Sequence, residues 1–266
     1  MAPDRRGRVG GPIVDRVLDG ATLVEVAAWG PVSVSRPGDG RDLAVLRAEG
    51  DDASAIVELA ERLWWLDGRG PAPRLVASGR DDAGAEVIVV EMGASAAPVI
   101  GGIVPLSPEA VAEHLAASLR AIHALPADDL LVDAGTELLL ERAHERVLRG
   151  RVDVAADGPY AGRSPVELLE VLGALFAELG AGDTSTVIHG NPGLEHLWFG
   201  PSSDPVFTGW ESGGGGDPHH DLAVAAASVA RHYGPALVAP LLEAYGLTDV
   251  DARRLDAHQL LAHLLR

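Results

Sequence analysis

The hydrophobic pattern of this chain changes at about residue 92, and the change restricts the folds that the chain can adopt. Before it, short segments alternate apolar and polar residues between turn residues, which predicts strands at 21–28, 32–36, 42–47, 71–78 and 85–92. A helix is predicted after the N-cap residues near Ser54, with its end near Gly68. Beyond residue 93 the pattern is mostly helical. We therefore predict an α+β fold with a small β-rich lobe over residues 1–92 and a helical lobe over residues 93–266.

Two helix starts in the second lobe carry strong local signals. Ser107-Pro108 and Ser164-Pro165 each place a capping serine before a proline that suits the first helical turn, and Glu167 completes a capping box. Further helices are predicted at 136–149, 221–233, 236–245 and 249–265. Four consecutive glycines at 213–216 are expected to form a loop with no preferred conformation.

Charge and composition exclude several classes of protein. The chain of 266 residues has 21 Lys and Arg residues against 39 Asp and Glu residues, which gives a net charge of −18. There is no lysine, so a P-loop, which requires one, is excluded. An acidic surface repels nucleic acids and anionic membranes, and it attracts cationic small molecules. Because there is no cysteine and no apolar run near the roughly 18 residues of a membrane span, we expect a cytoplasmic protein without disulfides.

Residues 187–197 have the outline of a kinase-like catalytic loop in which the working residues are exchanged. Such a loop needs His-Gly-Asp, four further residues and then Asn; the Asp accepts the proton of the attacking hydroxyl, and the Asn holds magnesium. Here Asn191 follows His189-Gly190, and His196 stands at the position of the magnesium ligand. The sequence thus indicates this fold and, in the same residues, argues against its usual chemistry.

An ordered series of segments over nearly the whole chain resembles the aminoglycoside 3′-phosphotransferase family. The series comprises residues 61–66, 71–79, 119–126, 145–153, 162–164 and 217–223. The resemblance implies a two-lobed, protein-kinase-like fold with a catalytic loop at 189–196 and a metal loop at 207–217. In the family pattern the histidine before the glycine is structural, and Asp221 caps the helix that follows the metal loop.

Three positions that would carry catalysis depart from the family pattern. The catalytic base falls on Asn191, whose amide cannot accept a proton as a carboxylate does. The first magnesium ligand falls on His196, although magnesium prefers oxygen ligands to imidazole. The second ligand falls on Gly209 and is therefore lost; Glu211 is the nearest carboxylate that could replace it.

The charged pair that would bind the nucleotide phosphates departs as well. The lysine of the third strand falls on Arg47, or on Leu46 if the register shifts by one residue. Arginine can bind phosphate, but with a different size and geometry. The helix glutamate that would pair with the lysine falls on Leu59, with Glu58 beside it.

Other parts of a nucleotide site remain recognisable. Gly30 and Ser33 occupy the expected nucleotide-covering loop, where Pro31 removes a backbone donor. The strand that ends at Glu91 and Met92 still offers backbone groups that could bind adenine. The cofactor is left open: ATP or GTP with magnesium is expected only if kinase activity remains.

The substrate end shows the same trend. Members of the family end in an acidic and aromatic tail that helps to bind the amines of the antibiotic, whereas Ala262 and His263 stand at the acidic pair here. Asp153 and Asp157 remain as acids near the expected substrate, and the net charge of −18 still favours cations. The resemblance therefore implies weakened binding of aminoglycosides.

Several other clusters are interpreted as structural. The histidines do not have a zinc spacing, although imidazole suits zinc or nickel better than magnesium. We predict packing roles for the tryptophan pair and no function for two isolated histidines. The clustered histidines are His189, His196, His219 and His220, and the tryptophan pair is Trp64 and Trp65. The two isolated histidines are His123 and His144.

Three hypotheses for function follow. The first is a pseudokinase of the aminoglycoside phosphotransferase family, catalytically inactive, which binds a small molecule or a protein between its lobes or acts as a regulatory partner. The second is an active phosphotransferase that uses ATP or GTP, with Glu211 holding metal and His189 or Glu195 acting as the base. The third, an enzyme of another class on the same fold, has only the clustered histidines in its favour.

Overall fold

This computed structural model describes residues 16–29, 32–50, 53–67, 69–92, 97–100, 105–127, 132–152, 160–180, 182, 186–199, 205–246 and 251–265. The chain divides into two compact units. The β-rich unit lies within Met1–Val104 and Leu197–Glu211, and the helical unit lies within Pro105–His196 and Ser212–Arg266. The β-rich unit therefore includes residues 197–211, which the sequence pattern groups with the helical lobe.

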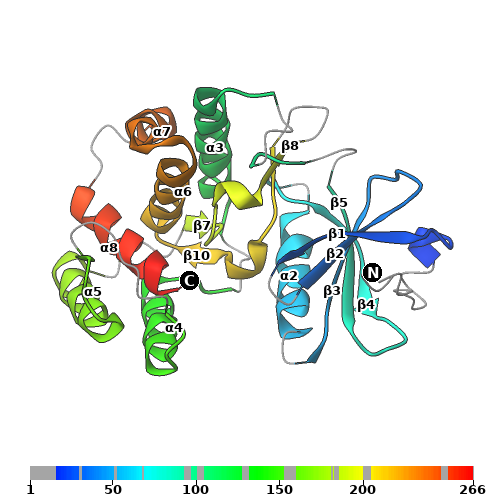
Figure 1. Cartoon of the computed structure of the whole chain (residues 1–266), viewed down its shortest axis with the longest axis horizontal. Coiled ribbons are helices and arrows are strands. Elements are labelled where there is room, and N and C mark those ends of the chain that lie inside the picture. Colours follow the sequence, from blue (N-terminus) through cyan, green and yellow to red (C-terminus); the bar gives the residue numbers. More distant parts are fainter. Residues whose placement is uncertain are drawn as a thin grey trace. The chain divides into compact units, whose positions relative to one another are not determined.

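An antiparallel sheet forms the body of the β-rich unit (Figure 1). Its order is β1 (Leu23–Trp29), β2 (Val32–Pro37), β3 (Ala44–Ala48), β5 (Glu86–Glu91) and β4 (Arg74–Arg80). The predicted strands are confirmed, with shifts at their ends. Strand β4 begins at Arg74 and not at Pro71, because Pro73 has no N–H for the ladder.

Helix α2 (Ala53–Leu66) covers one face of this sheet. Because side chains alternate along a strand, Leu46 of β3 faces α2, whereas its neighbour Val45 packs on the opposite face of the sheet. The packing role predicted for the tryptophan pair holds for Trp65, which is 9% exposed, but it is wrong for Trp64, which is 76% exposed. Consecutive residues point about 100° apart around a helix axis, so only one of the two can face the sheet.

A second, smaller sheet completes the β-rich unit. It has the order β6 (Ala97–Pro98), β8 (Leu197–Phe199) and β9 (Pro205–Phe207). The 3₁₀ helix η4 (Trp210–Ser212) follows β9, and the indole Nε1 of Trp210 donates to the carbonyl of Phe207 at 2.9 Å. The segment predicted as the metal loop thus begins at the end of a strand and includes a helical turn.

The helical unit contains most of the helices (Figure 1). Its elements are α3 (Pro108–His123), α4 (Thr136–Leu148), α5 (Pro165–Leu179), β7 (Thr186–Ile188), η3 (Leu194–His196), β10 (Gly214–Gly216), α6 (Pro218–Tyr233), η5 (Pro235–Leu237), α7 (Val238–Tyr245) and α8 (Ala252–Leu264). A buried cluster joins α4, α5 and α8 through residues such as Leu139, Leu172 and Leu261. Among the described residues, no helix is both long enough and apolar enough to cross a membrane.

The helix starts confirm the predicted capping signals, with one correction. Ser107 caps α3 and Ser164 caps α5, where Glu167 completes the predicted capping box. Helix α6, however, begins at Pro218, and its N-cap is Asp217. The prediction that Asp221 caps this helix is wrong, because Asp221 already lies inside its first turn.

The four glycines do not form an unstructured loop, so that prediction is wrong as well. Gly214–Gly216 form β10, which pairs antiparallel with β7. The backbone of residues 132–134 passes so close that Gly215 exchanges hydrogen bonds of 2.9 Å with Val132 and Ala134. A Cβ atom at Gly216 would lie 2.5 Å from the Ile188 side chain and 2.7 Å from the carbonyl oxygen of Ala134. Glycine is therefore needed here for close backbone packing, which fixes the strand that leads into the loop at 189.

Candidate functional site

Asp221 holds the backbone of the loop that follows β7. It is fully buried, and its two carboxylate oxygens accept the N–H groups of His189 and Gly190, each at 2.7 Å. The Nε2 atom of His123 lies 3.1 Å from the same carboxylate, and its Nδ1 atom lies 2.6 Å from the hydroxyl of Tyr245. Burial alone would raise the pKa of Asp221, but His123 and the backbone donors outweigh it and lower the pKa. A buried carboxylate anion thus organises the loop.

This network includes residues that sequence reasoning did not connect with the loop. His123 was expected to have no function, yet it contacts the carboxylate that orients the loop. Tyr245 was not singled out at all. Both lie on helices far from the loop along the chain, and no local spacing points to their contact.

Gly190 has a conformation and an environment that only glycine suits. Its φ is +82°, and a Cβ atom would overlap the carbonyl group of Ser212. Its own carbonyl oxygen lies 3.1 Å from Nε2 of His220, a buried residue of α6. The turn between β7 and Asn191 is therefore fixed from both sides.

Asn191 and His196, the residues predicted at the base and metal positions, contact each other. The side-chain nitrogen Nδ2 of Asn191 lies 3.0 Å from Nε2 of His196. An amide nitrogen only donates, so the imidazole nitrogen accepts this hydrogen bond with its lone pair. The backbone N–H of Asn191 in turn donates to Nδ1 of His189 at 3.2 Å. The donor at the base position thus occupies the atom that a metal at this side of His196 would need.

Glu195, which lies within η3 (Leu194–His196), is held as an anion. Its carboxylate accepts the hydroxyl of Ser228 at 3.2 Å and lies 3.5 Å from Arg231. Burial would raise the pKa of Glu195, but its own backbone N–H and the nearby His196 lower it. A carboxylate with a lowered pKa is a weaker general base, which does not favour the role considered for Glu195.

His219 of α6 and His258 of α8 belong to a polar cluster around Asp217. This carboxylate accepts the backbone N–H of His219, and Arg254 binds it at 2.6 Å. His258 of α8 lies 3.3 Å from the same carboxylate and is fully buried. Within the part of the chain that the structure describes, no group of three or more His, Cys, Asp or Glu side chains could hold a metal ion.

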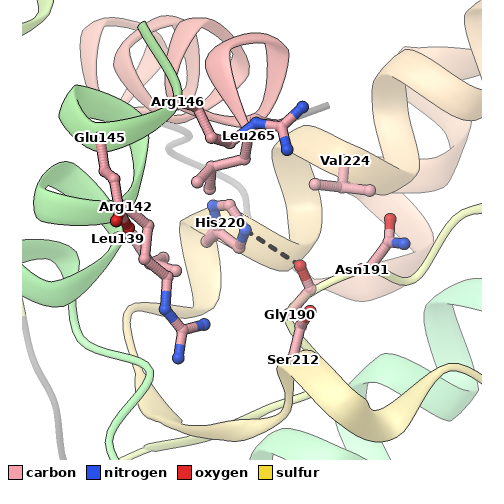
Figure 2. Close-up of a pocket in the computed structure, with 11 residues that line it drawn as sticks. Leu139, Arg142, Glu145, Arg146, Gly190, Asn191, Ser212, His220, Val224 and Leu265 are labelled. Atoms are coloured by element: carbon pink, nitrogen blue, oxygen red, sulfur yellow. Dashed lines mark hydrogen bonds between the residues drawn. The ribbon is translucent and has the colours of Figure 1, made fainter. Parts of the chain in front are cut away.

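A cavity of about 330 Å³ lies beside the loop in the helical unit (Figure 2). Arg142, Glu145 and Arg146 of α4 form one wall, and Asn191 and His220 form another. The remaining lining residues are Leu139, Gly190, Ser212, Val224, Ala262 and Leu265. Burial lowers the pKa of His220 to about 4, so this imidazole is neutral near pH 7.

Leu46, the alternative position for the lysine, and Leu59, the position expected for the glutamate, face each other in the β-rich unit. Leu46 of β3 and Leu59 of α2 line the same small cavity with Trp210. This cavity measures about 10 Å³, and a single water needs about as much. On β3 it is Leu46, and not Arg47, that faces α2. This agrees with the alternative register in which Leu46 stands at the lysine position.

Arg47 lies on the other face of β3, away from α2. Its guanidinium binds Asp81 at 2.6 Å and also pairs with Glu49. Burial would raise the pKa of Asp81, but the hydrogen bonds from Arg47 and from the N–H of Ala85 lower it. Arg47 is thus engaged in an ion pair within the sheet and does not occupy the face where a partner on α2 could reach it.

The other expected site residues are dispersed. Glu58 lies 3.4 Å from Arg62, Glu91 pairs with Arg74, and the Ser33 hydroxyl donates to the Arg47 carbonyl at 3.5 Å. Glu211 is exposed in η4, and Gly209 before it has a φ of +81°, which disfavours a larger residue. Gly30, Pro31, Asp153 and Asp157 lie outside the described residues. The roles assigned to these positions stay predictions.

Comparisons with known proteins match most of the chain to one family. A sequence model of the phosphotransferase enzyme family matches residues 25–258. An aminoglycoside 3′-phosphotransferase of Streptomyces fradiae is 30% identical over 227 residues, which cover 81% of each chain. The crystal structure of an aminoglycoside 3′-phosphotransferase of type VIII has a TM-score of 0.75 at 27% identity, and covers 92% of this chain and 94% of its own. An aminoglycoside phosphotransferase from Streptomyces rimosus has a TM-score of 0.77 at 21% identity, with 95% and 96% covered. The chain therefore belongs to the phosphotransferase enzyme family and has its protein-kinase-like fold.

Proposed function

We propose that this member of the phosphotransferase family has lost phosphoryl transfer and acts as a ligand-binding protein. The observation that carries the proposal is the contact of 3.0 Å between Asn191 and His196. These two side chains stand where the family needs a carboxylate base and an oxygen ligand for magnesium. Here they donate and accept a hydrogen bond between themselves, and neither offers a carboxylate.

The β-rich unit supports the same proposal. Leu46 and Leu59 replace the charged pair that would orient nucleotide phosphates, and the cavity they line with Trp210 is nearly filled. Phosphoryl transfer depends on positioning and on neutralising charge, so losses at the base, the metal ligands and the phosphate-binding pair affect every part of the reaction. The ligand is proposed to bind in the cavity of the helical unit; a protein partner stays a second proposal.

Nucleotide binding and transfer can be measured together. We would record thermal unfolding with ATP or GTP, with and without magnesium, and assay phosphorylation of kanamycin. Saturation at about 100 times Kd would add about 2.7 kcal/mol to the free energy of unfolding and raise Tm visibly. We expect no magnesium-dependent shift and no phosphorylated product, while the relative from Streptomyces fradiae, assayed in parallel, gives both.

The alternative is an active phosphotransferase, which membership of the family favours. Magnesium-dependent phosphorylation of kanamycin would establish it and overturn the proposal. In that case Glu211→Gln and Glu195→Gln identify the replaced residues: loss of turnover in Glu211→Gln alone would assign a metal ligand, because Glu211 is exposed and makes few structural contacts.

A further inference from the structure

We propose that the cavity beside Asn191 binds a small anion, a compact molecule with phosphate or carboxylate groups, through Arg142 and Arg146. The inference rests on the proposed function, since it names the class of ligand that this site takes. Cationic aminoglycosides are the wrong sign for it.

The positive charge of the cavity comes from one face of α4. Arg142 and Arg146 are one turn apart, which places both side chains on the same side of the helix. Both line the cavity, and Figure 2 shows them on either side of His220 in that view. In a chain with a net charge of −18, two arginines at one cavity are a marked local reversal of sign.

Acidic side chains do not cancel this charge at Arg142. Glu145 is the acidic member of the described lining, and its carboxylate binds Arg149 at 2.6 Å on the surface of α4. No carboxylate among the described residues forms an ion pair with Arg142. Arg142 is partly buried at the cavity, and an anionic ligand would give its guanidinium a partner for charge-assisted hydrogen bonds.

The second arginine is held in place by the fold. Its Nε donates to the carbonyl oxygen of Leu264 at 3.2 Å, and one of its terminal nitrogens donates to the carbonyl oxygen of Arg151 at 3.0 Å. These contacts tie the arginine at 146 to the end of α8, close to Ala262 and Leu265 of the lining. Arg142 is therefore the adaptable side chain and Arg146 the fixed one.

The rest of the lining suits a polar molecule that is small. His220 is neutral and buried, and its Nδ1 atom has no hydrogen-bond partner in the described structure. Asn191 adds an amide, while Leu139, Val224 and Leu265 close the apolar side. A volume of about 330 Å³ lies at the lower end of the range of ligand sites, about 300 to 1,000 Å³.

Calorimetric titration of the full chain with inorganic phosphate and, separately, with citrate tests the proposal without nucleotide or magnesium. We expect one of the two to bind, and Arg142→Gln to weaken that binding about 10-fold to 100-fold, because hydrogen bonds to charged groups are strong. Arg80→Gln is the matched control: it removes the same charge from an exposed strand of the β-rich unit and should bind as the native chain does. Kanamycin is expected not to compete with the anion.

Two results would overturn the inference: no binding of either anion by the native chain, or equal binding by Arg142→Gln and the native chain. If Arg142→Gln fails to fold, amide hydrogen exchange of the native chain replaces it. The anion should then slow exchange in residues 139–149, and unchanged exchange there would count against the site. Phosphorylation of kanamycin would overturn the proposed function, whether or not the anions bind. If neither anion binds and no kanamycin is phosphorylated, only this inference is overturned.

Discussion

Asp221 is the residue on which the geometry of the loop depends most. It receives two buried backbone N–H groups and lies beside the partly buried imidazole of His123. An amide of the same shape cannot replace this carboxylate, because it presents a donor on one side where both oxygens now accept. The buried charge of Asp221 therefore holds the loop that carries Asn191, the residue predicted at the base position.

We expect Asp221→Asn to lower the free energy of unfolding by about 3 kcal/mol or more, since it removes one partner of a buried network. Urea unfolding followed by circular dichroism measures the change. Asp256→Asn is the control, because Asp256 is exposed on α8 and should change the value by less than about 0.5 kcal/mol. Equal effects of the two substitutions would mean that Asp221 does not anchor the loop.

Sequence reasoning located the residues of the loop but not their partners. The spacing of His189, Asn191 and His196 was visible because it lies within one short segment. The contact between His123 and Asp221 joins residues 98 positions apart, and it depends on how α3 packs against α6. Likewise, the sequence alone does not show whether Leu46 or Arg47 stands at the lysine position. That choice depends on which face of β3 meets α2.

At the scale of elements, local chemistry predicted helix starts well where one signal stood alone. Ser107 and Ser164 cap their helices as expected. At α6 the same signal, a capping residue before a proline, was present as Asp217-Pro218, but the interpretation of Asp221 as the cap overrode it. The glycine run failed for another reason: glycine tolerates many conformations, so only the neighbouring backbone of residues 132–134 selects a strand.

Two glycine substitutions separate close packing from helix propensity. Gly216→Ala should destabilise the protein by about 1 to 3 kcal/mol, because its Cβ atom would meet Ile188 and the carbonyl of Ala134 in a packed interior. Gly173→Ala, within α5, meets no atom within 4 Å and should stabilise by about 0.5 to 1 kcal/mol. Chemical denaturation of both variants measures these changes. If Gly216→Ala were neutral, β10 would not need the close approach that defines it here.

At the scale of the whole molecule, pH acts on stability in two opposite ways. With a net charge of −18, the folded chain repels itself near pH 7, and this repulsion weakens as pH falls toward the isoelectric point near 4.8. Burial acts in the other direction at His220. Desolvation, with a smaller effect of His258, lowers the pKa of His220 to about 4 in the folded state, against about 6.5 when unfolded.

The sign of the second effect follows from proton binding. Between about pH 6.5 and about pH 4 the unfolded chain takes up a proton at His220 that the folded chain does not, so stability from this residue is complete above the window and is lost as pH falls through it. The loss from pH 7 to pH 5 should be about 2 kcal/mol. His220→Gln keeps a donor for the Gly190 carbonyl but cannot take up this proton. The loss of unfolding free energy from pH 7 to pH 5 should therefore be smaller in this variant than in the native chain by about this amount. His144→Gln, an exposed site on α4, should reproduce the native difference. Parallel pH profiles for all three proteins would show that burial does not hold His220 in its neutral form.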